Sequence, residues 1–180
     1  MNATLSKTKW AVDAMHSEVH FKIKHLVIST VTGSFKTFSG SANFDGENIE
    51  SAQIEFTMDA NSVDTNQAQR DGHLKSADFF DTEKFPEIKF VSTSLKKTSG
   101  QNYKLSGNLT MHGVTKAVEV DAVHGGSAKD GQGNSKMGFE VTGTIHRKDF
   151  GLSYNAAMEA GGLTLGEDVK LSANLELVKQ

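Results

Sequence analysis

Along most of the chain, apolar and polar residues alternate one by one, which is the pattern of a β-strand with one buried face. The first clear case runs from 17 to 25, where Val19, Phe21 and Ile23 stand between charged or polar neighbours. Strands with this pattern are expected around residues 17–25, 38–44, 52–58, 88–90, 103–111, 118–122, 137–145 and 169–177. The chain is therefore expected to be all-β.

The connections between these strands favour antiparallel neighbours. Asp45-Gly46 is a hairpin dipeptide, and "MHGVT" at 111–115 gives a second turn. Phe35 is out of phase with the strand that follows, which suggests a bulge near residues 36–37. Short turns and a single Pro predict an extended eight-stranded antiparallel up-and-down barrel, closed to remove its edges, with a sandwich as the alternative.

One segment breaks the alternation. "NQAQRDGHLKSADFF" predicts one short helical insertion around residues 66–78, with Asn66 or Thr65 as N-cap and Gly72 as a weak point. The glycine-rich segment 124–136 is expected to be a flexible hairpin tip. With 180 residues, the chain fits a single domain covering 1–180.

The residues expected to face inward mix large and small side chains. An eight-stranded barrel either fills with side chains or holds one small ligand. Small inward residues such as Gly40, Gly107 and Gly143 favour a cavity, although glycine can also simply relieve strand coiling.

Composition narrows the classes of partner. A net charge of −3 and scattered lysines give no reason to expect nucleic acid. The absence of cysteine rules out disulfides and thiolate ligands, and eleven Phe against one Trp and two Tyr favour a dry interior. No stretch has the length of a membrane span and the start lacks a signal-peptide core, so the expected compartment is the cytoplasm, or the periplasm or exterior if a leader was removed.

A metal site is the first chemical hypothesis. "HSEVHFKIKH" places His16, Glu18 and His20 at the spacing that zinc-binding helices use. On a strand, however, residues four apart lie roughly 13 Å from each other, too far to share one ion. An exposed polar strand face is therefore preferred, and no metal is expected.

Acid-base catalysis is the second hypothesis, because Arg70, Asp71, His73, Asp78 and Asp81 crowd into twelve positions. There is no "GxSxG" nucleophile elbow. The two later aspartates suit backbone hydrogen bonds where a helix passes into a turn, and the first two residues can pair with neighbouring loops. No catalytic residue is expected.

Two alternative functions stay open at this point. One is a metal-assisted or acid-base enzyme using the region of His16, His20 and His73. The other is an interaction module with a filled barrel, which would contact its partner through 125–134.

An apolar interior that binds an apolar ligand is the third hypothesis. Leu74, Phe79 and Phe80 would then form a wall or lid, unless they simply plug the barrel. His25 lies at an inward position of an apolar series, so it is either a hydrogen-bonded core histidine or a contact for a ligand head group.

Ordered motifs along the chain resemble one known family. "WAVDAMHSEVHFKIKH" has the layout W-x-x-D-x-x-H-S-x-x-x-F-x-x-x-H and is followed by G-x-F-x-x-F-x-G at 33–40. The later motifs are "RDGHLKSADFFDTEKFPEIKF", "GNLTMHGVTKAVEV", "RKDFGLSYN" and "LGEDVKLSANLEL". Over nearly the whole chain these segments resemble the YceI-like proteins, which are described as polyisoprenoid-binding.

The resemblance implies a lipocalin-like barrel with a helix at one end and a hydrophobic tunnel. The tunnel would hold a polyisoprenoid or another long-chain amphiphile, such as an isoprenoid quinone or a prenyl phosphate, for carriage, storage or sensing. It implies no enzyme activity and no required cofactor beyond a bound isoprenoid lipid, and a homodimer is a possible assembly. Many members are periplasmic or secreted and carry a leader that this chain lacks.

The expected ligand contacts are inward-facing positions together with residues of the helical insertion and the "RKDFG" motif. They are Phe21, Ile23, His25, Phe38, Phe44, Ile54, Phe56, Met58, His73, Phe79, Phe90, Leu109, Met111, Phe139, Val141 and Phe150.

Overall fold

The computed structural model describes residues 6–159 and 161–180. Its strands are β1 (Lys7–Val12), β2 (Glu18–His25), β3 (Ser29–Phe35), β4 (Phe38–Asp45), β5 (Asn48–Asp59), β6 (Val63–Asp64), β7 (Glu87–Ser99), β8 (Asn102–Met111), β9 (Val114–Lys129), β10 (Ser135–His146) and β11 (Leu165–Lys179). The helices are α1 (Ala68–Lys75) and the 3-10 turns η1 (Ala14–His16), η2 (Ala60–Ser62) and η3 (Arg147–Phe150). Within these ranges no helix has the length and apolar composition needed to span a membrane.

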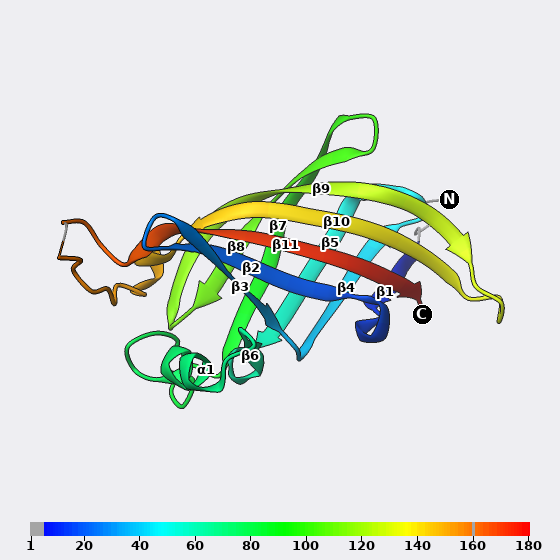
Figure 1. Cartoon of the computed structure of the whole chain (residues 1–180). Coiled ribbons are helices and arrows are strands. Elements are labelled where there is room, and N and C mark those ends of the chain that lie inside the picture. The colour runs from blue at the N-terminus through cyan, green and yellow to red at the C-terminus, as the bar shows by residue number, and fades with distance from the viewer. Residues whose placement is uncertain (1–5, 160) are drawn as a thin grey trace.

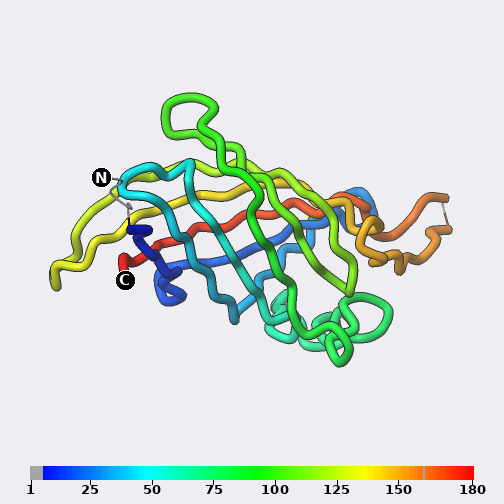
Figure 2. Tube along the Cα trace, turned by 180° about the vertical axis from the view of Figure 1, so that it is seen from behind, coloured from blue at the N-terminus to red at the C-terminus, as the bar shows by residue number. Residues whose placement is uncertain are grey.

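The strands form one closed antiparallel barrel (Figure 1). The pairs β1 with β2, β3 with β4 and β5 with β6 are each one long strand interrupted by a short break, so the segments amount to eight strands. Each strand pairs with its neighbour in sequence, and the ring closes where the first strand meets β11. The predicted eight-stranded up-and-down barrel is confirmed, and Figure 2 shows the same meander from behind.

Closure depends on a three-residue seam between β1 and β11, in which Trp10 faces Lys179 and Val12 faces Leu177. Beyond the seam the first strand breaks at η1 and resumes as β2, which pairs with the other half of β11. The break is bridged by two hydrogen bonds: the Asp13 amide donates to the Glu176 carbonyl (2.8 Å), and the Glu176 amide donates to Ser17 Oγ (2.9 Å). The W-x-x-D-x-x-H-S motif therefore builds the seam.

A cluster of partly buried charged side chains reinforces this seam. Lys136 Nζ from β10 lies 3.0 Å from Asp13 Oδ2 and 2.7 Å from Glu176 Oε1. The side chains of Asp13 and Lys136 keep only 18% and 17% of their surface exposed. Hydrogen bonds from His16 and then Lys136 hold the pKa of Asp13 at about 2, and those to Glu176 and Asp13 raise the pKa of Lys136.

The irregularity expected near residues 36–37 is a full break between β3 and β4. The Lys36 amide donates to the Ser62 carbonyl (3.1 Å), and the Asp59 amide donates to the Thr37 carbonyl (2.9 Å). Both neighbouring strands therefore break at the same level, and the backbone groups freed there satisfy one another across the gap.

The inward glycines do not open the interior, which corrects the expectation from the sequence. A Cβ added to Gly107 would lie 2.5 Å from the Val91 carbonyl oxygen, and the Phe90 ring fills the space in front of it. Gly143 is covered in the same way by Val120, and Gly40 by Phe56. These glycines seat large side chains from neighbouring strands.

For two segments, the expected first and last residues were wrong. Helix α1 is shorter than 66–78 and is capped by Gln67, whose Oε1 accepts the Arg70 amide (2.6 Å), because Asn66 has a φ of 64° and lies outside the helix. Segment 124–136 is mostly strand: β9 continues to Lys129 through a bulge, whose extra residue is Gly125, between the pairs Phe139–His124 and Gly138–Gly126.

Replacing Gly107 by Ala is expected to destabilise the barrel by about 1–3 kcal/mol, because the new methyl group would overpack the Phe90 ring and the Val91 backbone. Urea unfolding followed by circular dichroism measures the change. Gly131→Ala is the matched control, since no atom lies within 4 Å of the added Cβ there. Equal midpoints for the two variants would contradict the packing described.

The lowered pKa of Asp13 predicts a specific acid sensitivity. Since this value is about 2 in the folded chain against 3.8 ordinarily, the stability from the ionised carboxylate is fully present above about pH 4 and is lost as the pH falls toward 2. Urea midpoints of Asp13→Asn and the unsubstituted chain should therefore differ at pH 6 and converge near pH 2. Glu47→Gln, a control at an exposed turn, should have the same urea midpoint as the unsubstituted chain at both pH values.

Candidate functional site

The barrel interior contains two separate cavities rather than one tunnel. The larger has a volume of about 390 Å³ and the smaller about 80 Å³. Two buried clusters correspond to the two halves of the barrel, and Phe90 packs against both. Phe56 lines the smaller cavity and packs against the cluster around the larger one. Of these two, only the larger reaches the size of a small-molecule site, roughly 300–1,000 Å³. A more open and more polar hollow of about 530 Å³ is lined by Trp10, His124 and Lys179, among others, near the β9–β10 hairpin.

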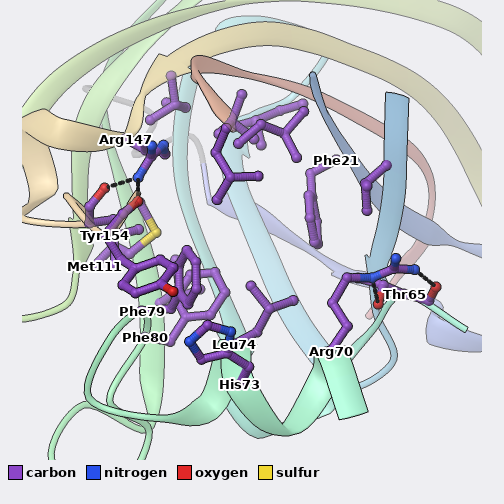
Figure 3. A pocket seen from close by; sticks show the side chains of 18 of the residues that line it. Phe21, Thr65, Arg70, His73, Leu74, Phe79, Phe80, Met111, Arg147 and Tyr154 are labelled. Atoms are coloured by element: carbon purple, nitrogen blue, oxygen red, sulfur yellow. Dashed lines mark hydrogen bonds between the residues drawn. The ribbon is translucent and has the colours of Figure 1, made fainter. Parts of the chain in front are cut away.

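The larger cavity lies at the end of the barrel that holds α1 and the irregular segments 151–159 and 161–164 (Figures 1 and 3). Strand residues form most of its wall. They are Phe21, Ile23 and His25 from β2, Val31 and Phe35 from β3, Met58 from β5, Ile88 from β7, Leu109 and Met111 from β8, Ile145 from β10, and Leu165, Val169 and Leu171 from β11. The wall is therefore largely apolar.

Helix α1 forms one side of the cavity and is fixed by its own charged residues. Arg70 Nε and Nη2 each donate to Thr65 over 2.7 Å, to the hydroxyl and the carbonyl oxygen. Asp71 Oδ1 accepts from the Thr65 amide (2.8 Å) and hydroxyl (2.6 Å). Leu74, Phe79 and Phe80 then face the cavity, as Figure 3 shows. This arrangement matches the wall or lid expected from the sequence.

An aromatic cluster joins this cover to the facing loop. The His73 ring makes edge contacts with Phe79 (5.0 Å between centroids) and with Tyr154 (4.9 Å), and Phe79 meets Tyr154 at 5.1 Å. His73 Nε2 is 2.8 Å from Asp78 Oδ2, which orients the ring. The helical cover and the loop thus contact each other through the aromatic rings of His73, Phe79 and Tyr154.

Arg147 holds the loop in place from the opposite side. Its Nη1 donates to the carbonyl oxygens of Leu152 (2.6 Å) and Tyr154 (2.8 Å), and its Nε donates to that of Gly166 (2.8 Å). Only 3% of the residue is exposed, and burial lowers the pKa of the guanidinium. Nη2 is buried without an acceptor among the described residues. Arg147 therefore organises one wall of the cavity and leaves a spare buried donor.

The sixteen expected contact residues fall into three groups. Phe21, Ile23, His25, Met58, His73, Phe79, Leu109 and Met111 line the larger cavity. Phe44, Ile54, Phe56, Phe139 and Val141 line the smaller one. Phe38, Phe90 and Phe150 line neither, although all three pack in or against the buried clusters.

Several lining residues were missed because they lie where the alternation is absent. Tyr154, Ala156 and Thr164 belong to the irregular segment after η3, and Thr65 lies just before α1. The sequence pointed to Arg147 only because it is the first residue of the "RKDFG" motif. Irregular loops have no periodicity that shows which side chains face inward.

The histidines of the enzyme hypotheses lie in separate settings. His16 Nδ1 is 2.9 Å from Asp13 Oδ2, whereas His20 Nε2 is 3.2 Å from Glu18 Oε2. Ligand atoms of Asp13, His16 and Glu176 lie close enough to hold an ion, but both carboxylates already bind the Lys136 ammonium. His16 and His20 thus do not form the joint site that the hypothesis required.

His25 lines the larger cavity, and its ring forms no hydrogen bond with any described residue. The explanation as a hydrogen-bonded core histidine is therefore not supported by the contacts of this ring. Among the described side chains, it is a polar group that faces the cavity without a partner in the protein.

Comparisons with known proteins agree with this architecture. The model of the YceI-like domain matches residues 10–177. The UPF0312 protein ECA1782 of Pectobacterium atrosepticum is 40% identical over 179 residues, covering 99% of this chain and 90% of that protein. The crystal structure of the Campylobacter jejuni YCEI protein has a TM-score of 0.76 at 36% identity, covering 88% of this chain and 91% of the other.

A more distant structure shares the fold. A polyisoprenoid binding domain from Saccharophagus degradans, described as implicated in plant cell wall breakdown, has a TM-score of 0.71 at 16% identity. It covers 95% of this chain and 98% of its own. The family model and the curated relative span almost the full length described above, and this chain belongs to the YceI-like family.

Proposed function

We propose that the protein binds the chain of an amphiphilic lipid, such as an isoprenoid quinone or a prenyl phosphate, in the larger cavity. The observation that carries the proposal is an apolar cavity of about 390 Å³ inside a closed barrel. Its wall consists mainly of aliphatic and phenylalanine side chains, which offer a hydrocarbon ligand no competing polar groups. The polyisoprenoid-binding description of the Saccharophagus domain supports the same class of ligand.

The driving force would be burial of hydrocarbon. Each Å² of apolar ligand surface removed from water contributes roughly 25 cal/mol, whatever the exact chain. Affinity for apolar chains is therefore expected to be broad, and selectivity falls to the cavity's length and to its few polar groups.

The polar groups favour a head group near the loop and helix end. His25 has a ring without a hydrogen bond to the protein, Tyr154 carries a hydroxyl at the rim, and Arg147 Nη2 lacks an acceptor. A quinone carbonyl or a phosphate oxygen supplies the acceptors that such donors require. The apolar chain would then extend toward Phe56 and Phe90.

A binding role is preferred to catalysis because the charged residues of the helical insertion serve the structure. Arg70 and Asp71 are committed to Thr65, and His73 is committed to Asp78. A catalytic base is normally oriented by a hydrogen-bond partner, and His25, the histidine that faces the cavity with a free ring, has no such partner among the described residues. No cofactor is required by the proposed binding, and carriage, storage or sensing are its possible uses.

Filling the larger cavity is expected to abolish lipid binding. Ile23→Trp adds a bulky ring to the wall of the cavity, whereas Val91→Trp adds the same ring on the outer surface of β7. Purified protein is extracted with organic solvent for mass spectrometry, and uptake of a short-chain isoprenoid quinone is measured by its absorbance after gel filtration.

The unsubstituted chain and Val91→Trp should yield lipid and take up quinone, and Ile23→Trp should lose at least about 90% of both. If the unsubstituted chain yields no lipid and takes up neither quinone nor prenyl phosphate, the proposal is wrong. Equal uptake by both tryptophan variants would place the ligand elsewhere.

Arg147→Met is expected to loosen the loop wall and weaken lipid retention. The substitution keeps a long side chain but removes the donors to three backbone carbonyl oxygens, at a cost of about 2–4 kcal/mol in unfolding free energy. Urea unfolding and the rate of quinone loss on dilution measure the two effects. Lys148→Met, next in sequence and exposed, is the control. Stability and quinone loss unchanged in Arg147→Met would refute the role given to Arg147.

A further inference from the structure

The turn between β2 and β3 exposes a group of large apolar side chains. Leu26, Val27 and Ile28 have 39%, 72% and 85% of their surface exposed. Leu163 and Tyr154, also partly exposed, belong to the irregular segment at the same end of the barrel (Figures 1 and 2). Single exposed apolar residues are ordinary, but a contiguous group marks an interaction surface.

The backbone of this turn carries strain. Leu26 and Val27 have φ values of 53° and 65°, a region that favours Gly, Asn or Asp and that is costly for a β-branched side chain. An Asn or Gly at either position would form the turn at lower cost. The fold thus keeps apolar side chains at the most exposed point of a strained turn, which points to a role for them outside the protein's own packing.

The turn is continuous with the rim of the larger cavity. The Leu26 amide donates to the Thr164 carbonyl oxygen (2.8 Å), and His25 pairs with Leu165 across the strands. His25, Thr164 and Leu165 all line the cavity. Figures 1 and 2 both show the β2–β3 turn beside segments 151–159 and 161–164, at the end opposite the β9–β10 hairpin. The apolar tip therefore lies at the mouth of the proposed lipid site.

Unneutralised lysines lie on the strands that lead to this tip. Lys22 and Lys24 are exposed on β2, and Lys170 of β11 pairs directly with Lys22, an arrangement of like charges that destabilises a sheet. The lysine ion pairs of the described residues involve Lys36, Lys84, Lys104, Lys136 and Lys148, and none of these three. The exposed strand face is thus basic.

Two of the nearby carboxylates are already paired within the chain, whereas Asp149 and Glu159 are exposed at the same end. Glu167 is paired with Lys148 and His146, and Asp168 with His146, whose pKa is raised by these contacts. Lys22, Lys24 and Lys170 are left to interact with anions outside the chain.

We propose that this end of the barrel docks on the surface of a bilayer that contains anionic phospholipid. Leu26, Val27 and Ile28 would enter the boundary between head groups and acyl chains, and the lysines would contact lipid phosphates. Passage of a ligand between bilayer and cavity rests on the proposed lipid-binding function, whereas the docking itself does not.

A membrane fits this surface better than a protein does. A stable protein interface buries about 800 Å² on each partner. Three side chains at the tip of a turn offer far less area, but apolar tips flanked by basic residues suffice for interfacial binding to lipid.

Flotation of the whole chain with vesicles tests the docking. The chain should bind vesicles of phosphatidylcholine that contain about 30% phosphatidylglycerol, which gives a strongly anionic surface. Binding should weaken at high salt. Val27→Asn/Ile28→Gln removes apolar surface without changing charge and should lower the bound fraction about tenfold. The Asn also suits the backbone at 27, so this variant should be at least as resistant to urea as the unsubstituted chain.

Matched controls separate location from chemistry. Met15→Gln removes an apolar side chain that is 91% exposed but lies on η1, away from the mouth, and should bind vesicles normally. Lys22→Glu/Lys24→Glu should lose binding to the anionic vesicles, whereas Lys97→Glu/Lys129→Glu, with the same charge change on other exposed strand ends, should lose little.

The outcomes also separate this proposal from the lipid-binding function. If the unsubstituted chain does not float with anionic vesicles, or if the tip variant floats equally well, docking is wrong. If the tip variant takes up quinone from solution normally but exchanges it with vesicles about tenfold more slowly, both proposals hold. A chain that floats but yields no lipid and takes up neither quinone nor prenyl phosphate refutes lipid binding alone. Tip-dependent capture of a protein instead of vesicles refutes the membrane as partner.

Discussion

The structure depends on the hydrogen bonds that close the sheet between its first and last strands. An open sheet of this length would expose an edge with unpaired amides and carbonyls, whereas the pairing of β11 with β1 at Trp10 to Val12 and with β2 removes that edge. The seam is short because β11 has to serve two partners, β1 at one end and β2 at the other. Ser17 and Asp13 make this change of partner possible, since their groups replace the ladder bonds lost at η1.

The remaining motifs gather at the cavity end and support one another. His112, in the turn of "MHGVT", packs against Phe85 and bonds through Nδ1 to the Phe150 carbonyl (3.1 Å). Phe150 itself is fully buried, and Arg147 from the same motif orders the loop beyond it. Residues far apart in sequence thus fix three connections around one end of the barrel. The other end is tied by the Asp13, Lys136 and Glu176 cluster and by the Lys97 amide, which donates to Glu50 Oε1 (2.8 Å).

The alternation of residues predicted most of the strands, their order and the closed barrel, because one face of these strands packs inward. It did not predict β1 or β3, whose residues lie outside the expected strands. The helical insertion and its position over the cavity followed from Leu74, Phe79 and Phe80. Alternation could not show what fills the interior: Gly107 and Gly143 face inward, yet Phe90 and Val120 occupy the space they leave. It also gave no sign of the Arg147 wall or of Tyr154, because carbonyl acceptors in an irregular loop depend on tertiary contacts rather than on local pattern.

The division of the interior by Phe56 and Phe90 has a consequence for how such barrels differ from one another. The circumference and tilt of a closed eight-stranded sheet are fixed by its hydrogen bonds, so they are slow to change. The position of two phenyl rings is set by single residues and by the glycines that seat them. The depth of the larger cavity can therefore change while the barrel stays the same: moving these two phenyl rings along the strands, or replacing them by smaller side chains, would alter that depth without changing a single strand pair.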